Sequence, residues 1–285
     1  MATYGAPASA QHVSAVHLHV DNDFFAMQLG RAPMDFDYTS GLELGVEIDG
    51  APGWASRLVA KAREGSTLHL SVGQHIYTPR SRGVRDIPGR RPFAGWLYGA
   101  AEARSESDTI VRALRVEIGV IGPLTLAEGT QNSLHILLGS EQLPGWENQL
   151  PAEPGFAARY DVARRIHLVK GDESGFEARP GVALGLGTIW SGAQAGVDVI
   201  AKRGSFTLLA GFQGEWVWRN EFLDGAAFRS SESTPKIPIV GQFDYGVGLR
   251  LGRLGATARF IARSREYHGQ PSSHLYGSLT ASFYF

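Results

Sequence analysis

The sequence lacks cysteine, which excludes a disulfide-stabilised scaffold, a zinc site of the Cys-x-x-Cys type and a thiol nucleophile. It also lacks any apolar run approaching the roughly 18 residues of a transmembrane helix. Charge is scarce, because charged residues make up only 19 % of the chain, and 27 Lys and Arg against 28 Asp and Glu leave a net charge of −1. General nucleic-acid-binding proteins are usually clearly basic, so we expect no nucleic acid among the partners of this chain.

What the chain has instead is glycine, 36 residues among 285, and a repeating alternation of apolar and polar side chains. The C-terminal segment is the clearest example, because Leu275, Leu279 and Phe283 share one side of an extended chain while Ser278 and Thr280 share the other. A period of two residues predicts β-strands. The same alternation recurs along most of the sequence, whereas helical spacing is rare.

The alternation predicts about twelve strands, many of them longer than the usual strand of a globular protein. They are expected near residues 13–25, 39–49, 66–78, 93–106, 108–120, 156–170, 175–188, 189–200, 205–219, 238–252, 255–268 and 274–285. An even number of long antiparallel strands with one apolar and one polar face is typical of a transmembrane β-barrel. We therefore predict an all-β fold, a transmembrane antiparallel barrel, in which residues 1–285 form a single domain.

Two features favour the barrel over a soluble β-sandwich, which also alternates. The polar face carries many charges, which suit a hydrated and ion-paired lumen, and the chain ends on an aromatic strand at Phe285. Met1 to Gln11 lacks the charged and then apolar order of a secretory signal peptide. We therefore expect a mature exported form with an added starting Met, in which residues 1–12 are flexible.

The longest predicted loop, residues 121–155, contains a short helix that we expect to run from Thr130 to Leu138 and to end at Gly139. Either Thr130 or Asn132 is a suitable N-cap residue. His135 on this helix is a candidate general base, and Glu141 follows it six residues later. Because of that separation, the two residues do not share one helix face, and Gly139 has to turn the chain between them.

Three other groups of polar residues lie near predicted strand ends. Asp21-Asn22-Asp23 carries oxygen ligands suited to a hard cation, and 37–41 (Asp-Tyr-Thr-Ser-Gly) adds hydroxyls and a carboxylate. Arginines 80, 82, 85, 90 and 91 crowd one loop, and arginine binds phosphate in a bidentate manner. Taken alone, each group is explained at least as well by an ordinary solvated turn or loop.

Five motifs that occur in one order along the chain together resemble a known family, although each motif alone would be a weak signal. They are VDNDFF (20–25), DYTSGLELG (37–45), GQHIYTP (73–79), RPFAGWLYG (91–99) and GVIGPLTLAEGTQNSLHILLGSEQLPGW (119–146). With them, the chain resembles the lipid A 3′-O-deacylases of the LpxR type, a family of Gram-negative outer-membrane barrels. The resemblance runs along most of the chain and implies a twelve-stranded barrel whose site lies at the outer rim, between the wall and a loop helix.

The resemblance also implies an activity, a calcium-dependent hydrolysis of the ester that holds the 3′-linked acyloxyacyl chain of lipid A. It assigns catalytic roles to Asn22, Asp23, Thr39, His135 and Glu141, and calcium (Ca²⁺) binding to Asp23, Thr39 and Glu141. The family has a functional lysine after its Tyr-x-Pro motif, whereas this chain has only arginines there, and Arg82 or Arg85 is expected to bind substrate phosphate instead. The implied partners are lipopolysaccharide and outer-membrane lipids, and we expect a monomer.

Within the enzyme class, a serine nucleophile is the rival to His135 acting on water. Ser133 lies two residues before His135, and residues two apart on a helix point in different directions, so this dyad is disfavoured. Ser40 is left open by the sequence. From other classes, a non-catalytic barrel (a channel or a structural protein) is the alternative function, and a soluble binding module is the alternative fold.

Overall fold

In the computed structural model, the described residues are 12–23, 25, 37–60, 65–79, 89–139, 141–171 and 173–285. Apart from His12, the predicted N-terminal segment lies outside them. The strands are β1 (Val13–Asn22), β2 (Asp37–Asp49), β3 (Ser66–Thr78), β4 (Ala94–Glu106), β5 (Ile110–Ile121), β6 (Glu153–Arg164), β7 (Ile166–Lys170), β8 (Ser174–Gly187), β9 (Trp190–Arg203), β10 (Phe206–Asn220), β11 (Ile239–Leu251), β12 (Leu254–Arg263) and β13 (His274–Tyr284). The helices are α1 (Gly53–Val59), α2 (Ala127–Leu138) and α3 (Glu221–Asp224), with short 3-10 turns at Gly122–Thr125 and Trp146–Asn148.

The strands form a closed antiparallel barrel of twelve long strands. From β1 to β6 and from β8 to β13, each strand pairs with the next one in the sequence, while β1 pairs with β13 and β6 with β8 to close the ring. The predicted strand 156–170 is wrong as a single element: β6 ends at Arg164, and β7 continues along β8 as a short extension. Two other predicted strands end early. The first stops at Asn22 rather than 25, and β12 stops at Arg263 rather than 268, because Glu266 and Tyr267 turn into the buried interior.

The two faces of the wall differ as the alternation predicts. Large apolar side chains are exposed on the outer face, where lipid would cover them, including Leu44, Val72, Ile118, Val182, Leu208, Phe212 and Trp216. Charged side chains face the lumen in ion pairs, for example Arg115 with Glu43 at 2.6 Å and Arg263 with Glu215 at 2.6 Å. No helix in the described part of the chain is both long and apolar enough to cross a membrane.

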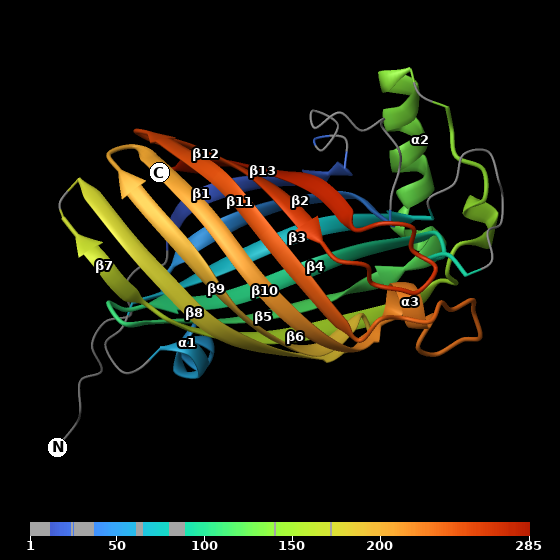
Figure 1. Cartoon of the computed structure of the whole chain (residues 1–285), viewed down its shortest axis with the longest axis horizontal. Coiled ribbons are helices and arrows are strands. Elements are labelled where there is room, and N and C mark those ends of the chain that lie inside the picture. Colours follow the sequence, from blue (N-terminus) through green and yellow to red (C-terminus); the bar gives the residue numbers. More distant parts are fainter. Residues whose placement is uncertain are drawn as a thin grey trace.

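The barrel has two unlike ends (Figure 1). One, here called the turn end, carries the start of β1, the C-terminus, α1 and tight turns such as Gly204 and Gly252, whose φ angles are positive. The other, here called the loop end, carries α2, α3 and the longer connections. Outer-membrane barrels have short periplasmic turns and long extracellular loops. The loop end therefore has the features expected of the cell's outer surface.

Helix α2 begins earlier than the sequence suggested. It starts at Ala127 after Leu126, and neither Thr130 nor Asn132 caps it, because Thr130 lies inside the helix and its hydroxyl donates to the Leu126 carbonyl. The hydroxyl of Thr125 instead accepts from the Ala127 amide at 3.3 Å. The predicted end is confirmed: Gly139 adopts φ 68° and its amide donates to the carbonyls of His135 and Ile136.

Candidate active site

Three of the predicted site residues lie at the loop-end rim of neighbouring strands. His17, His19 and Asp21 of β1 line the lumen, so Asn22 points to the outer face, where it pairs in register with Ser40 of β2. Asp23 follows in a 3-10 turn directly after the strand. Asn22 and Asp23 thus sit at the outer edge of the wall, two strands and about 10 Å from β3.

Thr39 reaches the same face because the register between β2 and β3 shifts at Tyr38 and Ser40. Tyr38 lines the lumen, while the buried hydroxyl of Thr39 lies 2.6 Å from that of Thr78 on β3. A bulge of this kind re-aims one side chain without ending the strand. The structure therefore places Thr39 against β3, the strand on which α2 is anchored.

The bulge is held by a buried residue just before it. Asp37 has φ 45°, a conformation that costs free energy in a non-glycine residue. Its carboxylate accepts hydrogen bonds from the Tyr267 hydroxyl at 2.7 Å and from the Gln270 amide at 3.0 Å. The Arg91 guanidinium adds an ion pair at 3.9 Å. These contacts fix the start of β2 and, two residues later, the position of Thr39.

Arg91 is one of the five crowded arginines, and its surroundings differ from those of a solvated loop residue. It is 2 % exposed and binds the Glu266 carboxylate at 2.7 Å. Burial alone raises the pKa of Glu266, but Arg91 and Arg263 together lower it to about 2. This arginine is therefore part of a permanent ion-pair network. Arg82 and Arg85, predicted to bind phosphate, lie outside the described residues.

Helix α2 is fixed to the outer face of β3 and β4 through its first turn. The Gln74 amide of β3 donates to the Thr125 carbonyl at 2.6 Å, just before the helix. Ala127 then packs against Ile76, Phe93 and Trp146. One turn further on, the side-chain oxygen of Gln131 accepts from the Trp146 indole at 3.0 Å. The buried side of the helix therefore runs from the barrel wall towards His135.

His135 lies on that buried side, one turn after Gln131, and is 9 % exposed. Its Nδ1 lies 2.5 Å from the backbone carbonyl oxygen of Glu141. Because a carbonyl only accepts hydrogen bonds, Nδ1 must carry the proton, and the lone pair is on Nε2. The carboxylate of Glu141 is not needed for this contact and belongs to an exposed residue. Ser133 is exposed on another side of the helix.

The residues expected to bind calcium are oxygen donors, which is the chemistry that calcium prefers. The described residues hold no group of three or more His, Asp or Glu side chains arranged around one metal position. An additional oxygen is available on α2: Oδ1 of Asn132 is buried and has no hydrogen-bond partner in the described structure. Asn132 precedes His135 by three residues and so lies on the same side of the helix. The donor chemistry thus fits a hard cation.

The sequence assigned no role to four residues that support the site. Thr78 contacts Thr39, Trp146 contacts Gln131, and both Tyr267 and Gln270 contact Asp37, in each case through a side-chain hydrogen bond. Gln131 itself had a local signal, because it precedes His135 by four residues and therefore shares its helix face. The four residues that hold the site lie 15 to 233 positions away from the residues that they contact.

A solved structure of LpxR from Salmonella typhimurium superimposes with a TM-score of 0.80 at 21 % identity, covering 95 % of this chain and 100 % of that one. Two autotransporter barrels, that of BrkA from Bordetella and that of NalP from Neisseria meningitidis, reach TM-scores of 0.48 and 0.47 at 9 % and 11 % identity. They cover 97 % and 96 % of this chain, and 100 % and 89 % of their own chains.

A search of curated protein sequences finds no match. The family model described as outer membrane protein LpxR matches residues 1–201 and 198–285, which together span the whole sequence. The closed twelve-stranded barrel agrees with that match. The chain belongs to the LpxR family of outer membrane proteins.

Proposed function

We propose that this protein is a lipid A 3′-O-deacylase of the Gram-negative outer membrane, an esterase that removes the 3′-linked acyloxyacyl chain. Membership in the LpxR family supports an outer-membrane enzyme that modifies lipid A. The observation that carries the finer proposal is the hydrogen bond from His135 Nδ1 to the Glu141 carbonyl, since it leaves Nε2 as a base.

In this mechanism, Nε2 of His135 takes a proton from a water molecule as the water oxygen attacks the ester carbonyl. The tetrahedral oxyanion then collapses, the bond between the acyl carbon and the 3′ oxygen breaks, and His135 returns the proton to that oxygen. The products are a free acyloxyacyl acid and lipid A with a 3′ hydroxyl. Positioned general base catalysis typically accelerates such a step by about 10²- to 10⁴-fold.

The rim residues on the wall would hold the reacting groups opposite the helix. Asn22 and Asp23 supply amide and carboxylate oxygens, and the fixed Thr39 supplies a hydroxyl. These residues, with Glu141 or the buried Asn132 oxygen, would hold calcium. When bound, the ion would supply positive charge to the developing oxyanion. Arg82 and Arg85 are the proposed contacts to the phosphate of the lipid A head group.

The position of the site suits a lipid substrate. Asn22 and Thr39 lie on the outer face at the loop end, where the wall meets the outer leaflet of the membrane if the long loops face outward. Helix α2, which is anchored on β3 at the same end of the barrel, carries exposed Ile136 and Leu137 in its last turn. Acyl chains could therefore stay in an apolar environment while the ester reaches His135.

Mass spectrometry of lipid A tests the proposal directly. The refolded barrel is incubated in detergent with lipid A, once with calcium and once with excess chelator. A mass loss of one acyloxyacyl group with calcium, abolished by chelator, is the expected result. Full activity in chelator would overturn the role of calcium, and no mass loss from a folded barrel in either condition would favour a non-catalytic barrel.

A further inference from the structure

A short helix lies on the outer face of the barrel near its turn end (Figure 1). Helix α1 buries Ala55 and Val59 against Ala103 of β4. Leu114 of β5 packs against the same cluster. It belongs to the outer face, because side chains alternate along a strand and its neighbour Arg115 lines the lumen. Helix α1 therefore covers the wall rather than the opening of the lumen.

The side of α1 that faces away from the wall is also apolar. Trp54 and Leu58 lie four residues apart and so share one helix face, and they are 69 % and 52 % exposed. The Tyr160 hydroxyl of β6 donates to the Leu58 carbonyl at 3.3 Å, which holds the end of the helix on the wall. A helix that is apolar on both sides is typical of surroundings without water, either protein or lipid. The exposed face of α1 therefore fits an apolar partner.

This exposed face continues the lipid-facing surface of the wall. On the outer face of β5, Leu114 beneath the helix is followed by Val116 and Ile118, which are both exposed. A strand rises about 3.3 Å per residue, so Val116 lies about 7 Å from Leu114 towards the loop end. Helix α1 therefore lies at the border of the apolar band, and lipid that covers the band also reaches the helix.

The aromatic residues at the turn end place Trp54 at the membrane surface. Phe206 of β10 and Phe283 of β13 are exposed on the outer face near this end. Outer-membrane barrels carry such aromatic girdles at both membrane surfaces. On β4, however, the outward residues nearest to this end are Ala103 and Ser105. Trp54 of α1 supplies the aromatic ring that β4 lacks.

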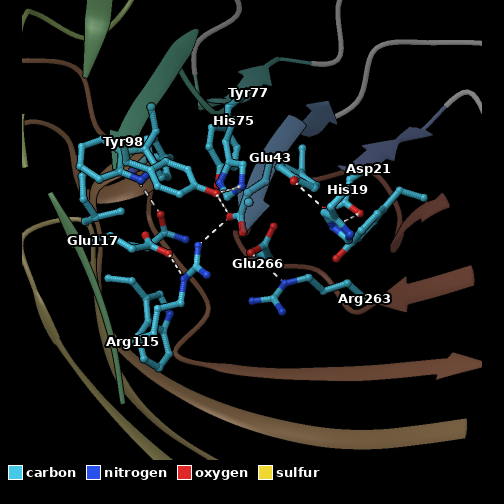
Figure 2. A pocket seen from close by; sticks show the side chains of 18 of the residues that line it. His19, Asp21, Glu43, His75, Tyr77, Tyr98, Arg115, Glu117, Arg263 and Glu266 are labelled. Atoms are coloured by element: carbon cyan, nitrogen blue, oxygen red, sulfur yellow. Dashed lines mark hydrogen bonds and ion pairs between the residues drawn. The ribbon is translucent and has the colours of Figure 1, made fainter. Parts of the chain in front are cut away.

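The outer face carries positive charge at the same border. Arg57 in the last turn of α1 and Arg164 at the end of β6 are both exposed. Neither forms an ion pair with another residue in the described part of the chain. Figure 2 shows that Glu117 of β5 lies inside the lumen instead, where it binds Arg115 at 2.7 Å. Exposed arginines beside an apolar surface match the phosphates of lipid head groups.

We propose that α1 is an interfacial anchor that binds anionic phospholipid at the turn-end surface of the membrane. Trp54 and Leu58 lie among the acyl chains just below the head groups, and Arg57 contacts a lipid phosphate. The amphipathic ring of tryptophan favours this depth in a bilayer. The anchor depends on the position of the barrel in a membrane and does not depend on lipid A deacylation, whose proposed site lies at the opposite end.

Fluorescence quenching in vesicles tests this position, because the chain has no cysteine and one introduced thiol carries the only label. Leu58→Cys is labelled with bimane, and the folded barrel is reconstituted into vesicles of phosphatidylethanolamine and phosphatidylglycerol. Lipids with a nitroxide near the head group quench a probe at the membrane surface, whereas iodide on both sides of the bilayer quenches a probe in water. We expect strong quenching by the lipid nitroxide and weak quenching by iodide.

Two labelled variants calibrate these readings. Val72→Cys lies on the exposed outer wall and should respond to lipid, whereas Asp108→Cys, in the turn between β4 and β5, should respond to iodide. Trp54→Cys, one helical turn from Leu58, gives an independent second reading of α1, and heat-modifiable migration confirms that each barrel is folded. Iodide quenching at Leu58 and Trp54 as strong as at Asp108 would overturn the proposal and leave this face to a protein partner.

The head-group preference is tested in the Leu58→Cys protein with matched nitroxide lipids. Nitroxide phosphatidylglycerol should quench more than nitroxide phosphatidylcholine, by up to about 5-fold, because an arginine near the surface attracts anionic lipid. Arg57→Gln should reduce this difference, whereas Arg229→Gln, exposed at the loop end, should keep it. Equal quenching by the two lipids before Arg57 is replaced would overturn the preference for anionic phospholipid.

Discussion

The hydroxyl of Tyr267 donates a 2.7 Å hydrogen bond to the carboxylate of Asp37, a residue 230 positions earlier in the chain. Both side chains are buried, and Asp37 has a strained φ of 45°. The contact joins the loop between β12 and β13 to the first residue of β2, two positions before Thr39. Strain of this kind persists only where the surroundings enforce it.

Removing this hydrogen bond by Tyr267→Phe should therefore weaken the rim without disturbing the wall. We expect a loss of about 1–3 kcal/mol in the stability of the loop. The loop should become more sensitive to protease, and deacylase activity should fall several-fold as Thr39 loses its fixed position. Tyr245→Phe, on the exposed outer face, is the control. Unchanged loop cleavage and activity in Tyr267→Phe would show that this contact does not position the site.

The proposed general base gives the sharpest test of the chemistry. His135→Ala removes Nε2 and should lower the initial rate of lipid A deacylation by about 10²- to 10⁴-fold. Because His135 lies on a loop helix, the barrel should remain folded and heat-modifiable on a gel. His268→Ala, an exposed histidine at the same end, is the control. Activity within a few-fold of wild type in His135→Ala would exclude this residue as the base.

Much of the fold follows from the sequence because a period of two residues is a local signal. The alternation around Leu279 indicates a strand with one apolar face wherever its partners lie. The break at Arg165 was missed because the apolar and polar alternation continues through it. Both β6 and β7 pair with β8, and what ends at Arg164 is the pairing of β6 with β5. The predicted end of β12 was wrong for a similar reason, because Glu266 leaves the wall to bind Arg91, which is distant in sequence.

In the candidate site too, contacts between residues close in sequence could be predicted, whereas contacts between distant residues could not. His135, Glu141 and the turn at Gly139 lie within one short segment, and their relation was visible from spacing. That His135 contacts the backbone carbonyl of Glu141 could not be predicted, because a backbone carbonyl is the same in every residue and leaves no signal in the sequence. The bulge at Thr39 depends on Tyr267 and Gln270 from the far end of the chain. Local motifs can suggest such residues, but only the closed barrel brings their supports together.

Replacing each of two glycines in the α2 segment by alanine should change the stability of the helix in opposite directions. Gly129 lies within the helix with open space around a Cβ, so Gly129→Ala should stabilise the helix by up to about 1 kcal/mol. Gly139 also has open space but adopts φ 68°, so Gly139→Ala should cost about 1–2 kcal/mol and displace the Glu141 carbonyl from His135. Hydrogen exchange across 127–138 and deacylase rates measure both effects. The same direction of change in both variants would contradict this account of the helix end.

A pair of buried carboxyl groups, those of Glu221 and Glu153, lies at the loop end. Glu221 of α3 and Glu153 of β6 both accept from the Ala227 amide, and Glu153 also accepts from the Phe228 amide. Burial of Glu221 and its hydrogen bond with Glu153 raise the pKa of Glu221 to about 7, although Arg219 at 3.5 Å opposes the shift. Protonated Glu221 therefore favours the folded arrangement of the loop that contains Ala227 and Phe228.

A folded-state pKa above the unfolded value means that this stabilisation is complete below about pH 4.5 and is lost as the pH rises through about 7. Above that pH, two carboxylates would face each other and repel. Hydrogen exchange at Ala227 and Phe228, corrected for intrinsic rates, should show less protection at pH 8 than at pH 6. Glu221→Gln should remove this difference, while Glu232→Gln, exposed on the same loop, should keep it. Equal protection at both pH values in the wild type would rule out Glu221 as the titrating group.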